Sequence, residues 1–229
     1  MTQASTVVIN PKQTIASIVL AHSECAALFQ QWRIDFCCKG EQSLESACAA
    51  RSLAVPEIVR DLTDTIEKRA GATGPSVSEL STKELIDHIV STHHEYLRKT
   101  LPFVINLAKK VARVHGDRNP RLRAVDAIVV ALDAELTPHL DQEERVLFPS
   151  LLNGTNQGEQ RRLELECMKT EHLAVGALLG RLRDEAEEFR PPEWACTSYK
   201  TLMAELAQLE LDVLRHVHLE NHVLAPRYV

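Results

Sequence analysis

The sequence predicts an all-α protein in which a small helical domain precedes an up-down four-helix bundle. Apolar residues recur at helical spacing along nearly all of the 229 residues, and no sustained alternation of apolar and polar residues indicates a strand. The segment 70–78 holds two glycines and a proline among small residues, which is typical of a break between domains. We therefore expect a small domain over residues 1–70 and a bundle over residues 79–229.

Three helices are expected in the small domain. The first covers about residues 14–32, where apolar residues form one stripe, and the second covers about residues 43–51. The third begins at Pro56, because proline is favoured at the first helical position. A non-periodic segment that contains two adjacent cysteines separates the first helix from the second.

The bundle is predicted from four long helical patterns joined by short breaks. They cover about residues 82–114, 121–151, 158–189 and 196–224. Long helices with short connections pack as antiparallel neighbours, which favours the up-down arrangement. Ser81 and Glu84 form a capping box at the start of the first of them. We expect Pro102 and Pro138 to kink their helices.

Composition excludes several classes of partner. The chain is 45% hydrophobic and 25% charged, as folded globular domains are, and its net charge of −6 gives no basic patch for nucleic acid. No stretch approaches the roughly 20 apolar residues of a membrane span, and no signal-peptide pattern opens the chain. We expect a cytoplasmic protein, in which cysteines stay reduced. The six expected free thiols are Cys25, Cys37, Cys38, Cys48, Cys167 and Cys196.

An internal repeat is the strongest functional signal. The segments that begin at His139 and at His216 both have the pattern H-x3-E-x2-V-L-x-P. A histidine and a glutamate four residues apart lie on one face of a helix, so His139 with Glu143 and His216 with Glu220 can each face one centre. His139 shares its apolar stripe with residues that include Val146, which directs the pair into the core.

The other two bundle helices each add one inward histidine. His94 and His172 lie among apolar residues at helical spacing, so the bundle core receives four histidines and two glutamates. Imidazole and carboxylate ligands suit iron, manganese or zinc, and two carboxylates that can bridge favour a pair of metals. Redox-active iron is the usual occupant of such bundle cores. The six candidate metal ligands are His94, His139, Glu143, His172, His216 and Glu220.

For the remaining histidines a solvent-facing position is the expectation. They are His22, His88, His93, His115, His218 and His222. Two glutamates keep three interpretations each. Glu135 lies a turn before His139 and Glu171 lies beside His172, so both are candidates to support the ligands, to line an access path for iron, or to form solvated ion pairs.

The second constellation is the segment Asp35-Phe36-Cys37-Cys38-Lys39-Gly40 at the end of the first helix. Adjacent cysteines rarely form an unstrained disulfide with each other, so the pair suits metal or nitrosyl binding or transient redox chemistry. Lys39 is expected to favour the thiolate. The alternative is that Cys37 and Cys38 are two small buried side chains.

At these residues the chain resembles the RIC family (repair of iron centres), di-iron proteins of the YtfE, ScdA and NorA type. The small N-terminal domain of that family carries a D-[FY]-C-C-G-G motif, seen here with Lys39 in place of the first glycine. The resemblance covers almost the whole chain and implies a haemerythrin-like bundle that holds two non-haem iron ions, ferrous or ferric, with an oxo or hydroxo bridge. It gives the ligand roles to His94, His139, Glu143, His172, His216 and Glu220.

The resemblance also implies a function. It indicates a stress protein that repairs iron-sulfur clusters damaged under nitrosative or oxidative conditions, by donating iron, with Cys37 and Cys38 relaying iron or electrons. Its partners would be damaged iron-sulfur proteins, with nitric oxide or dioxygen as small ligand and a homodimer as a candidate assembly. The alternative is a nitric-oxide-binding protein, as trap, sensor or reductase. An oxygen carrier ranks lower, because no fifth terminal histidine can be placed. Classical enzyme activity stays open.

Overall fold

The computed structural model describes residues 9–69, 77–154 and 158–228, and within them the regular elements are helices. An isolated antiparallel bridge between Thr14 and Ser43 is the extended pairing found there. The all-α prediction is therefore confirmed. Most of the expected domain break at 70–78 lies outside the described residues. Among the described helices, none combines the length and the apolar character that crossing a membrane requires.

Among the described residues, the small domain contains four α-helices. They are α1 (Ile15–Ala21), α2 (Ala26–Gln31), α3 (Leu44–Ala50) and α4 (Val55–Arg69), with a 3-10 turn at Ser23–Cys25. The single helix expected over 14–32 is wrong, because His22 takes a non-helical conformation and ends α1. The break turns the chain so that Ile15 and Phe29, both 0% exposed, join one core.

In the part of the bundle that the structure describes there are four helical columns, and three of them contain a π turn. The first column is α5 (Thr82–Ile89), a π turn (Val90–His94) and α6 (Glu95–His115); the second is α7 (Arg121–Gln142), a π turn (Glu143–Leu147) and α8 (Phe148–Asn153). The third is α9 (Glu159–Glu185), and the fourth is α10 (Thr197–Leu219) with a π turn (Glu220–Leu224). Short 3-10 turns are found at Val77–Glu79, Glu187–Phe189 and Ala225–Arg227. The capping box of Ser81 and Glu84 is confirmed.

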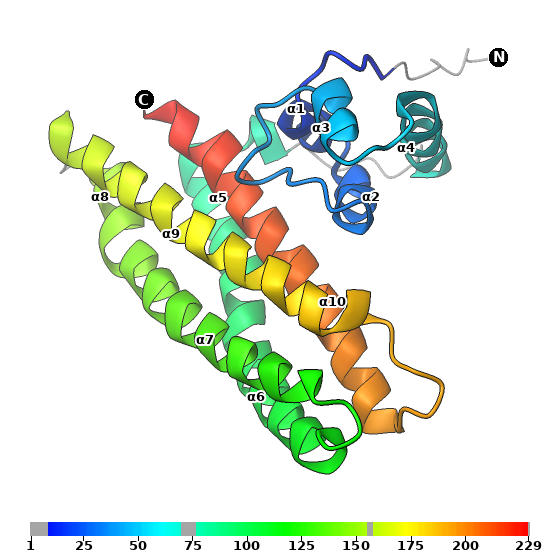
Figure 1. The fold of residues 1–229 in the computed structure, drawn as a ribbon. Helices are drawn as coiled ribbons and strands as arrows, with labels where there is room; N and C mark the ends of the chain where they lie inside the picture. The colour runs from blue at the N-terminus through cyan, green and yellow to red at the C-terminus, as the bar shows by residue number, and fades with distance from the viewer. Residues whose placement is uncertain (1–8, 70–76, 155–157, 229) are drawn as a thin grey trace.

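The columns run alongside one another, and the small domain lies against the side formed by α9 and α10 (Figure 1). The bundle helices continue through Pro102 and Pro138, and the irregular turns lie elsewhere. In both repeats the π turn is followed by a proline, Pro149 or Pro226. Proline lacks an N–H and its ring excludes the carbonyl four residues earlier, which loosens the preceding turn. The V-L-x-P half of the repeat thus accompanies a widened turn.

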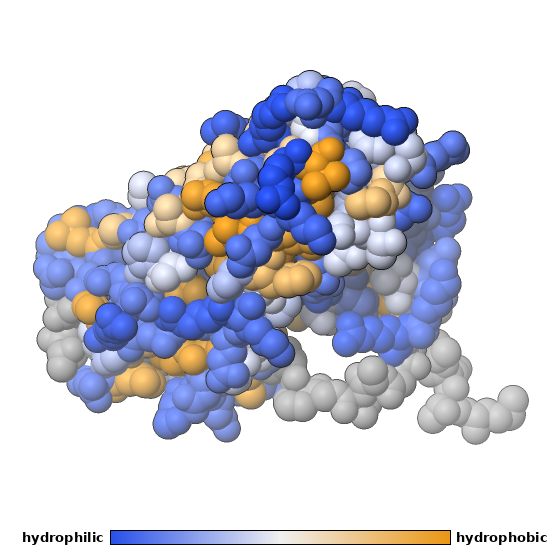
Figure 2. Space-filling view, turned by 90° about the horizontal axis from the view of Figure 1, so that it is seen from below, coloured by the Kyte–Doolittle hydropathy of each residue, from blue (hydrophilic) through white to orange (hydrophobic). Residues whose placement is uncertain are grey.

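The site sits between two apolar clusters. Along each column, one set of buried apolar residues precedes the candidate ligands and the other set follows them, as Leu136 and Leu147 do around His139 and Glu143. Val146, expected on the inward stripe, is 40% exposed, because the π turn that contains it shifts the helical register. Outside, hydrophilic residues cover much of the face seen from below, with apolar residues in patches between them (Figure 2).

Candidate metal centre

All six candidate ligands lie in the bundle core, and none is more than 5% exposed. The four columns each contribute, and three of the six residues begin or end a π turn. A π turn adds one residue to a helical turn and so re-aims the side chains around it. His94 ends one such turn, and Glu143 and Glu220 begin the other two.

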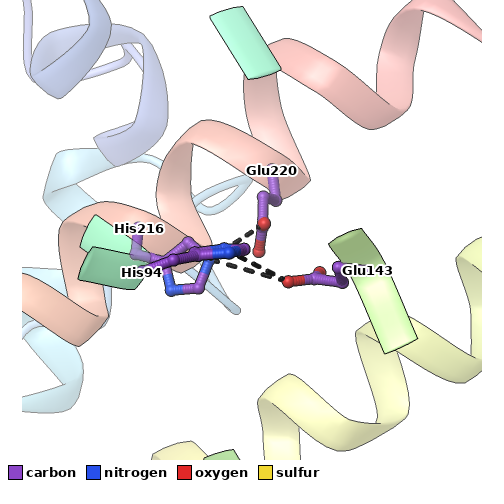
Figure 3. Close-up of side chains that lie close together, drawn as sticks. All are labelled: His94, Glu143, His216 and Glu220. Carbon is purple, nitrogen blue, oxygen red and sulfur yellow. Dashed lines mark hydrogen bonds and ion pairs between the residues drawn. The ribbon is translucent and has the colours of Figure 1, made fainter. Parts of the chain in front are cut away.

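The six side chains form two groups that share both glutamates. In one group, His94 and His216 place their Nε2 atoms 3.1 Å apart, beside the two carboxylates (Figure 3). In the other, the Nε2 atoms of His139 and His172 lie 3.2 Å apart beside the same carboxylates. In each group the donor atoms lie within 4.8 Å of one another, as ligands of one ion must.

Each glutamate directs one oxygen to each histidine pair. Glu143 Oε1 lies 3.3 Å from His139 Nε2, while its Oε2 lies 3.5 Å from His94 Nε2. Glu220 repeats the arrangement, with Oε1 2.9 Å from His216 Nε2 and Oε2 3.1 Å from His172 Nε2. Each of the two carboxylates therefore spans both imidazole pairs.

The electrostatics fit a cation between these side chains. Burial, reinforced by the neighbouring carboxylate of Glu220, raises the pKa of Glu143 well above its usual value. Burial also opposes ionisation of Glu220, but the His216 and His172 imidazoles outweigh it and hold the pKa of Glu220 well below its usual value. Burial lowers the pKa of His216 to about 4, so this imidazole is neutral and can ligate.

Unpartnered atoms give a second test of the fit. Neither oxygen of Glu143 has a hydrogen-bond partner among the described residues, and Glu220 Oε2 has none either. A buried carboxylate without a partner carries a large desolvation cost, which a bound cation removes. Neutral imidazoles and carboxylates are also ligands that iron accepts. The residues present therefore fit a pair of iron ions.

Three of the four histidines are held by an outer partner. The Nδ1–H groups of His94, His139 and His172 donate to Glu144 at 2.9 Å, Glu171 at 2.7 Å and Asn221 at 3.0 Å, respectively. Such bonds fix the tautomer and leave Nε2 free to bind metal. The fourth, His216, has no partner for Nδ1 among the described residues, and the ring of His93 stacks on it with centroids 5.8 Å apart.

These outer partners were only partly foreseen. Glu171 accepts from His139, in agreement with the interpretation that it supports a ligand. Glu135, a candidate for the same role, is exposed on α7. Glu144 and Asn221 were missed, although both directly follow a repeat glutamate, which is a signal that the alignment of the two repeats offers.

The solvent-facing expectation is wrong for two histidines. His93 is buried because its Nδ1 pairs with Asp212 at 2.9 Å, and His218 is buried because its Nδ1–H donates to the Phe36 carbonyl at 3.0 Å. The histidines at 22, 88, 115 and 222 are partly buried. Among the described residues, no fifth histidine joins either group of candidate ligands.

Cys37 and Cys38 are free thiols whose sulfur atoms lie 3.5 Å apart. Asp35 shapes their turn, since its Oδ1 accepts from the backbone N–H groups of Cys37 at 3.1 Å and Cys38 at 2.8 Å. The hydrogen bond with Cys38, then burial and the Asp35 charge, raise the pKa of Cys37 well above its usual value. The expectation that Lys39 favours a thiolate is therefore wrong for Cys37, and Lys39 is exposed.

The cysteine turn lies directly over the candidate centre. The Cys38 thiol donates to the backbone carbonyl of His172 at 3.7 Å. Asn221 Nδ2 donates to the Cys37 carbonyl at 3.1 Å, while Asn221 Oδ1 accepts from His172 Nδ1. His222 Nε2 also bonds to the Cys37 carbonyl, at 2.8 Å. One asparagine thus joins the small domain to a candidate ligand.

A cavity of about 240 Å³ reaches the centre from the side of α9. His139 and Glu143 form its inner wall, and Cys167 and Glu171 are among the residues that line it further out. Both Glu143 oxygens lack a hydrogen-bond partner among the described residues, so a small molecule or an ion that enters here meets an available carboxyl group. The His139 side of the centre is therefore the accessible one.

Comparison with known proteins agrees with this geometry. Residues 85–228 match the family described as hemerythrin HHE cation binding domain, and residues 11–65 match ScdA_N, a domain of unknown function. The chain is 34% identical to the iron-sulfur cluster repair protein YtfE of Enterobacter sp. (strain 638), over 94% of this chain and 96% of the relative. It is 32% identical, over the same shares, to a probable iron-sulfur cluster repair protein of Haemophilus influenzae. YtfE of Yersinia pseudotuberculosis (strain YPIII) is 34% identical over the same shares. The chain belongs to the RIC family, as a haemerythrin HHE domain that follows an ScdA_N domain.

Proposed function

We propose that the chain is a di-iron protein that repairs damaged iron-sulfur clusters by donating iron. The six side chains would hold two iron ions, with His94 and His216 on one, His139 and His172 on the other, and both glutamates between them. The observation that carries the proposal is the position of Glu143 and Glu220, which direct one oxygen to each histidine pair. The repair of iron-sulfur clusters is taken from the names of the relatives. The two family matches, at residues 11–65 and 85–228, fall inside the proposed domains, 1–70 and 79–229.

Bound iron would supply a redox-active, exchangeable cation, and the protein's own groups decide which ion leaves. The His94 pair faces stacked and buried side chains, whereas the His139 pair borders the 240 Å³ cavity. We therefore assign the donated iron to the His139 and His172 position.

Cys37 and Cys38 are assigned the relay of iron or electrons. The Cys38 thiol already contacts the His172 backbone, and Asn221 ties the same turn to the His172 imidazole. A displacement of the small domain would therefore move His172, a proposed ligand of the donated ion. Six free cysteines suit the cytoplasm that the proposal assumes. Damaged iron-sulfur proteins are the proposed partners, and a homodimer remains a candidate assembly.

The donor function is tested with the iron-loaded chain and a nitric-oxide-damaged cluster enzyme. We expect the enzyme to regain activity faster than with the same amount of free ferrous iron. The double variant Cys37→Ser/Cys38→Ser should keep its iron and lose the advantage over free iron. Recovery no better than with free iron would refute the donor proposal.

A nitric-oxide-binding function, with dioxygen as the competing small ligand, is the second candidate, and the cavity beside Glu143 favours it. The cavity gives a diatomic molecule a direct path to the accessible side of the centre. Nitric oxide is added to the reduced protein while the spectrum and the product gas are followed. A stable adduct without nitrous oxide indicates a trap or sensor, and nitrous oxide indicates a reductase.

A further inference from the structure

A second and larger cavity, of about 360 Å³, lies between the small domain and the bundle. Its lining comes from the cysteine turn and α3 on one side and from α9 and α10 on the other. This volume is within the range of pockets that hold small molecules. The cavity is separate from the one that reaches Glu143, and none of the six candidate iron ligands lines it.

Two glycines keep this cavity open. Gly176 and Gly180 are one turn apart in α9, and both line the cavity. A Cβ atom added at Gly176 would meet only the Cys38 sulfur, at 3.9 Å, and one added at Gly180 would meet nothing within 4 Å. Glycine inside a helix lowers its stability, and no close packing requires glycine at either position. The missing side chains leave room for something other than protein.

Two of the four cations that line the cavity have no partner among the described residues. Arg183 is paired with Glu210 at 2.9 Å, and Arg33 is paired with Asp184 at 2.7 Å, so neither has a charge to spare. Lys39 and Arg51 also line the cavity, and their side chains have no hydrogen bond or ion pair with another described residue. Two exposed cations on one cavity rim attract a ligand with two negative groups.

The remaining lining groups indicate which other chemical groups such a ligand would have. Cys37 forms part of the wall, so a sulfur atom of the ligand would meet a thiol there. The side-chain amide of Gln42, which has no partner among the described residues, can bond a peptide group. Two acids also line the cavity: Glu210 is paired with Arg183, and Asp35 accepts from two backbone N–H groups through Oδ1.

We propose that this cavity binds a small peptide-like thiol with two carboxylates, of the glutathione class. The carboxylates lie on Lys39 and Arg51, and the thiol lies at the wall that Cys37 forms. The inference deepens the proposed function, because it places a soluble thiol beside the cysteine pair that is assigned the relay. Binding itself requires neither iron release nor any covalent step.

The test is calorimetric titration of the iron-loaded full chain with reduced glutathione and with an analogue in which a methyl group replaces the thiol. We expect glutathione to bind several-fold more tightly than the analogue. Gly180→Leu fills the cavity and should abolish binding at unchanged iron content. Arg51→Ala should weaken binding about two- to fivefold, as loss of an exposed ion pair does. Arg60→Ala, which removes an exposed arginine of α4 outside the cavity, should change nothing.

Three outcomes would overturn the inference. They are no binding to the wild type, equal binding of glutathione and its analogue, and full binding by Gly180→Leu, which would place the ligand elsewhere, for example on the iron. Iron content and cluster recovery are measured on the same samples. A chain that donates iron without binding glutathione defeats this inference alone, and the reverse result defeats the donor proposal alone.

Discussion

Replacing Asn221 by alanine should weaken iron binding at one position and loosen the small domain. The side chain accepts from His172 Nδ1 at 3.0 Å and donates to the Cys37 carbonyl at 3.1 Å. Loss of an outer partner of a metal-binding histidine lowers metal affinity by about 10- to 100-fold. Leaving the buried His172 N–H without an acceptor should also lower the free energy of unfolding by about 1–3 kcal/mol.

The assay is competition for ferrous iron against a chelator of known affinity, with chemical denaturation alongside. Asn221→Asp separates the two bonds, because the carboxylate still accepts from His172 but cannot donate to Cys37. We expect it to keep iron and to lose only the domain contact. Asn106→Ala, an exposed asparagine that bonds within its own helix, is the matched control. Iron affinity of Asn221→Ala equal to that of the control would refute the assigned role.

Four further predictions follow from the contacts described above. Glu143→Gln should reduce the iron content from two ions per chain to one or fewer, and should raise the unfolding temperature of the metal-free chain by a few degrees because it removes an unpartnered buried carboxylate. Arg183→Met should cost about 3–5 kcal/mol in denaturant unfolding by leaving Glu210 buried without its cation, and the further change Glu210→Leu should restore most of the loss. Burial alone would raise the pKa of Glu188, but its two arginine partners, Arg33 and Arg183, outweigh burial and lower it. The ionised side chain therefore stabilises the fold at any pH above its unfolded pKa, and this stabilisation is lost as the pH falls through the lowered folded pKa. The wild type should accordingly be more stable than Glu188→Gln at neutral pH and lose that advantage at acid pH, as measured by unfolding at both. Gly40→Ala should destabilise the small domain in thermal unfolding by about 2 kcal/mol or more, since its Cβ would lie 2.5 Å from a backbone oxygen.

The bundle and its six inward side chains were predictable because the residue spacing within each single helix shows which side chains face the core. His139 with Glu143, and His216 with Glu220, stand one turn apart on apolar stripes, and the match between the two repeats makes a shared role visible. The π turns were not predicted, because their extra residue leaves no mark in apolar spacing. They explain why Val146 is exposed despite its register.

The contacts between the domains could not be predicted from periodicity. His218 lies on a polar face of α10, where a single helix gives no reason for burial, and it is buried because the cysteine turn covers it. The role of Asn221 depends on the same contact. The glycines at 176 and 180 likewise look like weak points of a helix until the neighbouring domain encloses a cavity against them.

The central claim is that one buried centre holds a pair of iron ions bridged by Glu143 and Glu220. A Mössbauer spectrum of the iron-loaded chain, recorded together with iron quantitation, tests it most directly. The account predicts two irons per chain that are magnetically coupled, so that the fully oxidised protein has a diamagnetic ground state. One iron per chain, or two irons that behave as independent paramagnetic ions, would contradict it.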